Sequence, residues 1–150
     1  MTAKRKQRRY KILTVDDSRA ILTKITSFLE KRPEYEVTGV SDPVEAYALV
    51  ENEHFDVVIC DIEMPQMSGL ELLRKIKNFN GAIQVIVITG YITVNNTLDA
   101  FRYGAADLFF KPIKLKALGK AVEMSIDRLN HIEDLLHEVV SMREGRMINA

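Results

Sequence analysis

The chain has 150 residues, of which 47% are hydrophobic, and this size suits one globular domain with an appendage. Its 21 basic and 21 acidic residues balance, so the overall charge gives no indication of a polyanionic partner. No apolar stretch approaches the roughly 20 residues that span a bilayer, so we expect no membrane insertion. The single cysteine, Cys60, excludes an internal disulfide, which is typical of a cytoplasmic protein.

The first nine residues are polar and basic, and their apolar side chains show no periodicity. We predict that residues 1–9 form a disordered tail, because such a segment cannot bury enough apolar surface to offset its ordering entropy. Contact with nucleic acid or with an anionic membrane is the alternative. Basic side chains alone do not establish that contact, and we expect no nucleic-acid binding from this chain alone.

Predicted strands and amphipathic helices alternate five times along the rest of the chain. The predicted strands cover 10–15, 35–40, 55–60, 83–88 and 106–110. The predicted helices cover 19–31, 41 or 42 through 50, 68 or 69 through 76, 94–103, and 113 or 114 onward. Alternation at this spacing requires right-handed crossovers, which predicts an α/β fold with a parallel sheet and helices on both faces.

The last predicted helix is longer than such a domain needs. Its apolar side chains recur at alternating three- and four-residue steps, and Ser125 is the one polar residue on this stripe. The apolar members are Leu115, Leu118, Val122, Leu129, Ile132, Leu136 and Val139. We assign 10–125 to the domain and 126–150 to an extension that pairs as a homodimeric coiled coil, because no sheet remains to cover this stripe. A helix that folds back, or a linker to a further domain, is the alternative.

Polar side chains stand at the ends of four predicted strands. Asp16 and Asp17 follow the first strand, Asp61 the third, Thr89 the fourth and Lys111 the fifth. The carboxyl ends of parallel strands share one edge of a sheet, so these groups should converge. Adjacent carboxylates need a counter-charge, which Mg²⁺ supplies, while lysine and hydroxyl groups suit phosphate oxygens. The pattern predicts a site that moves a phosphoryl group with a carboxylate nucleophile.

These residues lie in motifs that resemble the receiver domain of two-component response regulators, over residues 10 to about 125. The motifs are LTVDDS at 13–18, DIEMPQMSG at 61–69, Thr89-Gly90, GAAD at 104–107 and Lys111-Pro112. The resemblance implies a flavodoxin-like sheet with strand order 2-1-3-4-5. It also implies a cis peptide bond between Lys111 and Pro112.

The resemblance further implies that Asp61 accepts a phosphoryl group from a histidine kinase or a phosphotransfer protein. It implies four Mg²⁺ ligands: Asp16, Asp17, Asp61 and the backbone carbonyl of Glu63. Thr89 and Lys111 would contact the phosphoryl oxygens. The chain would then be a phosphoacceptor signalling domain rather than an enzyme, one that assists its own phosphorylation and slow dephosphorylation and switches partner or dimer interactions.

The chain departs from the common receiver pattern at three places. Leu108 stands where an aromatic switch residue is common, and Ser68 replaces a frequent aspartate before the third helix. Glu63 and Tyr91, two residues beyond Asp61 and Thr89, would flank the path of the attacking water. We therefore predict slow hydrolysis of the acyl phosphate, with a phosphorylated lifetime of minutes or more.

Two other classes of function remain open. A Mg²⁺-dependent phosphohydrolase of the haloacid-dehalogenase type also uses an aspartate nucleophile, a threonine or serine and a lysine. That class needs a second aspartate where this chain has Glu63. The other alternative is a dimerisation module with a degenerate pocket, for which Asp61 would fail to take phosphate from acetyl phosphate.

Overall fold

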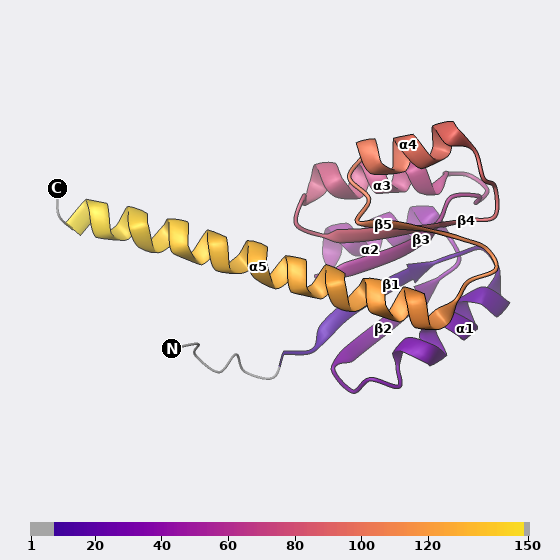
Figure 1. Cartoon of the computed structure of the whole chain (residues 1–150), viewed down its shortest axis with the longest axis horizontal. Helices are drawn as coiled ribbons and strands as arrows, with labels where there is room; N and C mark the ends of the chain where they lie inside the picture. Colours follow the sequence, from indigo (N-terminus) through magenta and orange to yellow (C-terminus); the bar gives the residue numbers. More distant parts are fainter. Residues whose placement is uncertain (1–7, 149–150) are drawn as a thin grey trace.

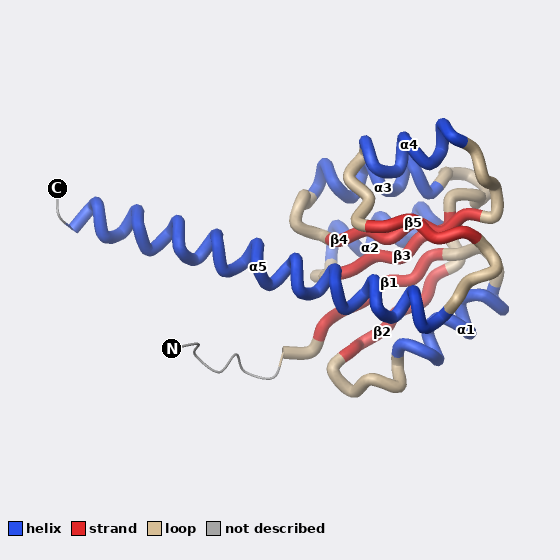
Figure 2. Tube along the Cα trace, viewed as in Figure 1, coloured by secondary structure: helices blue, strands red, loops and turns tan. Residues whose placement is uncertain are grey.

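The computed structural model describes residues 8–148, which form a five-stranded parallel sheet with helices on both faces (Figures 1 and 2). The strands are β1 (Tyr10–Val15), β2 (Tyr35–Val40), β3 (Val57–Asp61), β4 (Gln84–Thr89) and β5 (Asp107–Phe110). The helices are α1 (Arg19–Leu29), α2 (Pro43–Asn52), α3 (Gly69–Phe79), α4 (Val94–Arg102) and α5 (Leu115–Ile148). The strand order β2-β1-β3-β4-β5 confirms the flavodoxin-like arrangement expected from the resemblance.

The central strands end one residue later than the sequence pattern predicts. Asp61 still pairs with Ile88 of β4, and Thr89 still pairs with Phe110 of β5. The two polar residues are therefore the last members of their strands rather than the first residues of loops. Pairing on a neighbouring strand fixes their backbones, and this makes the edge of the sheet a rigid support for their side chains.

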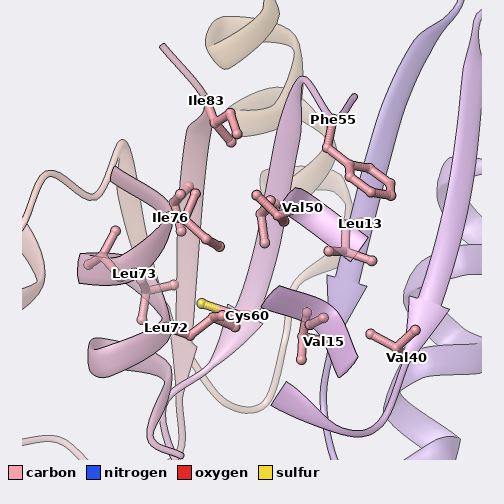
Figure 3. Packing of buried hydrophobic residues seen from close by; sticks show 14 of the residues in the cluster. Leu13, Val15, Val40, Val50, Phe55, Cys60, Leu72, Leu73, Ile76 and Ile83 are labelled. Atoms are coloured by element: carbon pink, nitrogen blue, oxygen red, sulfur yellow. The ribbon is translucent and has the colours of Figure 1, made fainter. Parts of the chain in front are cut away.

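The sheet separates two apolar cores. Along β3, Val58 and Cys60 point toward α2 and α3, whereas Val57 and Ile59 point toward α1 and α5, as the two-residue period of a strand requires. Figure 3 shows Cys60 among the side chains of the first core. Burial raises the pKa of its thiol to about 12, which favours the unreactive protonated form.

Helix α5 starts at the edge where the strands end and leaves the domain beyond the opposite edge (Figure 1). The first part of the predicted stripe is buried, with Leu118 and Val122 at 0% and Leu129 at 5% exposure. The same stripe then emerges, and Leu136 and Val139 are 57% and 51% exposed. Within residues 8–148 no helix is both long enough and apolar enough to span a membrane.

The predicted basic tail lies mostly outside the described residues, which begin at Arg8. The Arg8 guanidinium forms ion pairs with Asp56, just before β3, and with Glu133 of α5. Close to these contacts, the amide nitrogen of Asn130 lies 3.0 Å from the hydroxyl of Tyr10. The start of β1 is thereby joined to α5 near the point where the helix leaves the sheet.

Candidate functional site

The site begins with Asp61, whose position depends on a close contact with the start of α3. Gly69 donates its N–H to the carbonyl of Ile62 at 2.9 Å. A Cβ on Gly69 would lie 2.0 Å from the carbonyl oxygen of Asp61, so only glycine fits at this position. Ser68 caps α3 by accepting the N–H of Glu71 at 3.2 Å, as its place in the motif predicts.

Three carboxylates converge at the carboxyl ends of β1 and β3. Among the described residues, Asp16, Asp17 and Asp61 each offer an oxygen within 4.8 Å of the others. Asp16 and Asp61 are both 2% exposed, whereas Asp17 is exposed to solvent. The N–H of Ser18 donates to Oδ1 of Asp16 at 2.9 Å, which fixes this carboxylate at the turn into α1. The structure therefore brings the predicted acidic residues together.

Lys111 reaches this acidic cluster from the end of β5. Its Nζ lies 3.1 Å from Oδ2 of Asp61 and 3.3 Å from Oδ2 of Asp16. The Lys111–Pro112 peptide bond is cis, as the resemblance implies. The N–H of Lys111 donates to the carbonyl of Thr89 at 2.8 Å, so the backbone ties the lysine to the end of β4.

The single positive charge of Lys111 does not balance the negative charge of this acidic cluster. Burial raises the pKa of Asp61 to about 7, against the opposing hydrogen bond from Lys111, and burial also raises the pKa of Asp16. Within the described part of the chain, the buried Oδ2 of Asp16 accepts no hydrogen bond, and its contact with a cation is the 3.3 Å ion pair with Lys111. A cluster of carboxylate oxygens with an excess of negative charge fits a hard divalent cation such as Mg²⁺.

The side chain of Glu63 makes contacts that the sequence did not indicate. The hydroxyl of Thr89 donates to Oε1 of Glu63, and the N–H groups of Gly90 and Tyr91 donate to the same carboxylate at 3.2 and 3.0 Å. Burial would raise the pKa of Glu63, but the bond from Thr89 and the loop amides outweigh it and lower that pKa. The predicted site residue Thr89 is thus at the site with its hydroxyl already bonded.

The position of the common aromatic switch residue is filled by Leu108. This side chain is half-buried and packs against the core formed with α2 and α3. The next residue, Phe109, packs against the other core, and Phe110 is 42% exposed. An aromatic side chain therefore follows two residues later on the same face of β5 as Leu108.

Comparison with protein families and curated proteins identifies similar sequences. The family described as "Response regulator receiver domain" matches residues 12–123. Transcriptional regulatory protein FlgR of Helicobacter pylori is 38% identical over 112 residues, which are 75% of this chain and 28% of that protein. Transcriptional regulatory protein ZraR of Klebsiella oxytoca is 36% identical over 107 residues, 71% of this chain and 24% of that protein. The chain thus spans less than a third of the length of these relatives.

Solved structures of receiver domains are also similar to this chain over most of its length. A CheY-like response regulator receiver domain from Methanospirillum hungatei is 32% identical, with a TM-score of 0.79, and the match covers 82% of this chain and 98% of that one. The BeF3-activated receiver domain of DrrB is 29% identical, with a TM-score of 0.72, covering 79% of this chain and 98% of that one. Both matched structures are almost fully covered by the matching part.

Proposed function

Because this chain belongs to the family of response regulator receiver domains, we propose that it is a phosphorylation switch that takes a phosphoryl group onto Asp61. A carboxylate oxygen of Asp61 would attack phosphorus as the bond to the donor histidine nitrogen breaks, giving an acyl phosphate and a free imidazole. The observation that carries the proposal is the convergence of Asp16, Asp17 and Lys111 on this one carboxylate. The donor would be a histidine kinase or a phosphotransfer protein.

Mg²⁺ would be held by Asp16, Asp17, Asp61 and the backbone carbonyl of Glu63. When bound, the ion neutralises charge on the carboxylates and on the incoming phosphoryl group. The positions of Asp16 and Asp61 support this assignment, because both carboxylates are buried and share the single ammonium of Lys111 as their ion-pair partner. Asp17 is exposed and can approach an ion without a rearrangement of the core.

Lys111 and Thr89 would contact the phosphoryl oxygens after transfer. The ammonium already lies 3.1 Å from Oδ2 of Asp61, so it needs only a small movement to pair with a phosphoryl oxygen on that side chain. Thr89 would move its hydroxyl toward the same group and carry the β4–α4 loop with it. Phosphorylation would then shift the population between two arrangements of this face.

The outgoing part of α5 would pair with a second copy of the chain as a coiled coil. Support comes from the heptad stripe, which is buried as far as Leu129 and exposed at Leu136 and Val139. Phosphorylation would change the strength or register of this pairing. Sedimentation and crosslinking with and without beryllofluoride, a phosphoryl mimic, test the idea, and identical association in both states would contradict it.

Phosphorylation itself is tested with acetyl phosphate and Mg²⁺. We expect the intact mass to rise by one phosphoryl group, and we expect Asp61→Asn to abolish the gain. Asp42→Asn is the matched control, because Asp42 caps α2 and asparagine caps a helix equally well. A phosphoryl group that persists on Asp61→Asn would refute the assignment. Steady release of phosphate from a small phosphate ester would favour the phosphohydrolase alternative.

A further inference from the structure

The carboxylate of Glu63 gathers three donors from one short segment after β4. Oε1 accepts the hydroxyl of Thr89 and the N–H of Tyr91, and Oε2 accepts the N–H of Gly90 at 3.2 Å. Successive N–H groups in a turn form a concave site for an anion, and here a side chain of the same protein fills it. The filled site lies directly beside Asp61, since β3 and β4 are neighbours in the sheet.

A threonine hydroxyl has one hydrogen and can donate only one full hydrogen bond at a time. Thr89 is 1% exposed, and its hydroxyl oxygen also accepts the N–H of Tyr91 at 3.0 Å. The carbonyl of Tyr91 at 3.1 Å is a second acceptor for its hydrogen, but it lies farther away than the carboxylate of Glu63. A hydroxyl that donates to Glu63 is therefore not available to a second anion. The proposed phosphoryl group on Asp61 needs the same hydrogen.

We propose that Glu63 is a positioning residue that holds the Thr89 hydroxyl and the Gly90 amide in the unphosphorylated protein. A phosphoryl group on Asp61 must displace this carboxylate before Thr89 can donate to it. This inference rests on the proposed function, because it treats the phosphoryl group as the competitor. The carboxylate of Glu63 stabilises the loop after β4 in the unphosphorylated protein. Rearrangement of this loop on phosphorylation therefore requires that the phosphoryl group first outcompete Glu63.

The displacement is physically accessible from the observed position. Glu63 is exposed, so its side chain can turn into water without leaving a buried charge. It is only two residues from Asp61, so a dianionic phosphoryl group there would repel it. Attraction of the loop donors and repulsion of the carboxylate would therefore act together when Asp61 is phosphorylated.

The contact itself can be tested without phosphate or metal. We expect the amide resonances of Gly90 and Tyr91 to move in Glu63→Ala, because both N–H groups lose a charged acceptor. Glu71→Ala removes an exposed carboxylate from the first turn of α3 and serves as the matched control. Unchanged Gly90 and Tyr91 resonances in Glu63→Ala would overturn the proposal.

The competition is tested by the affinity for beryllofluoride in the presence of Mg²⁺. Four proteins are compared: wild type, Glu63→Ala, Thr89→Ala and the double variant. We expect Glu63→Ala to bind about tenfold more tightly than wild type, the effect of releasing a hydrogen bond to a charged group. In the Thr89→Ala background, Glu63→Ala should increase the affinity for beryllofluoride by less, because it then relieves only the charge repulsion from Glu63.

The outcomes separate this inference from the function on which it rests. An equal gain with and without the Thr89 hydroxyl would overturn the inference and leave the phosphorylation switch intact. Failure of every variant to bind beryllofluoride or to take phosphate from acetyl phosphate would overturn the proposed function, and the competition with it. Glu63→Gln gives a further readout, because it keeps an acceptor oxygen and should retain part of the Thr89 dependence.

Discussion

Arg8 and Glu133 are 125 positions apart in the sequence, yet Nη1 of Arg8 lies 2.8 Å from Oε1 and 2.9 Å from Oε2 of Glu133. The other terminal nitrogen of the same guanidinium pairs with Asp56, whose side chain is 1% exposed. Asp56 also accepts the N–H of Lys11 at 2.9 Å, and Nε2 of His54 lies 2.8 Å from it. These contacts join the start of β1, the start of β3 and the departing part of α5.

Loss of Arg8 should destabilise the fold, because it removes the guanidinium that pairs with the buried carboxylate of Asp56. We expect Arg8→Ala to lower the free energy of unfolding by about 1–3 kcal/mol. Arg9→Ala removes the neighbouring exposed cation and should change the free energy of unfolding by less than about 0.5 kcal/mol. Urea denaturation measures both. Equal effects would mean that the ion pairs of Arg8 contribute nothing specific.

Asp61 should make the metal-free protein less stable as the pH rises. Its pKa is raised from 3.8 to about 7 in the fold, chiefly by burial, so the unfolded chain loses the proton first. Stability is therefore lost between about pH 4 and 7, and Asp61→Asn should remove this loss. We compare the free energy of unfolding of Asp61→Asn with that of wild type in EDTA. The difference in favour of the variant should be roughly 2 kcal/mol larger at pH 8 than at pH 5. A constant advantage would contradict the shift.

Much of the fold and most of the site could be predicted because they depend on local pattern. The short apolar run before Asp61 predicts a buried strand, and strands of one direction place Asp16, Thr89 and Lys111 at one edge. Their convergence follows from topology alone, without knowledge of side-chain rotamers. Strand ends were less certain, because a terminal residue such as Thr89 joins the strand only through pairing with its neighbour.

The contacts that sequence did not predict are those that depend on side-chain direction or on distant segments. The bond from Thr89 to Glu63 requires a particular rotamer of an exposed glutamate. The ion pair between Arg8 and Glu133 requires the path of α5 to be known over many turns. A signal was present for Asp56, a charged residue directly before an apolar strand, but its partner Arg8 looked like part of a basic tail.

Magnesium affinity should depend on Asp17, although it is the exposed member of the acidic cluster. We expect Asp17→Asn to weaken Mg²⁺ binding about tenfold or more, because it removes one of the carboxylates that lie within 4.8 Å of each other. Asp127→Asn, an exposed position on α5, is the control for loss of one charge. Calorimetric titration with Mg²⁺ measures both, and equal affinities would exclude Asp17 as a ligand.

Hydrolysis of the acyl phosphate should be faster when the side chains that flank the site are small. Tyr91 is 66% exposed beside Thr89, so Tyr91→Ala opens the approach to Asp61 without disturbing the core. We expect several-fold faster loss of the phosphoryl group after removal of acetyl phosphate, and a further increase when Glu63 is also shortened. Ile92→Ala is the matched control, because Ile92 is 67% exposed and follows Tyr91 directly. An unchanged lifetime would refute the role of Tyr91 in excluding water.

Leu129 and Leu136 lie on one stripe of α5 but should behave in opposite ways. Leu129 is 5% exposed against the domain, so Leu129→Ala should lower the free energy of unfolding by about 2–4 kcal/mol. Leu136 is 57% exposed, so Leu136→Ala should change that free energy by less than about 0.5 kcal/mol at low protein concentration. It should instead weaken self-association in sedimentation experiments, because it removes an apolar contact between paired helices. If Leu136→Ala associates as well as wild type, the outgoing helix does not pair through this stripe.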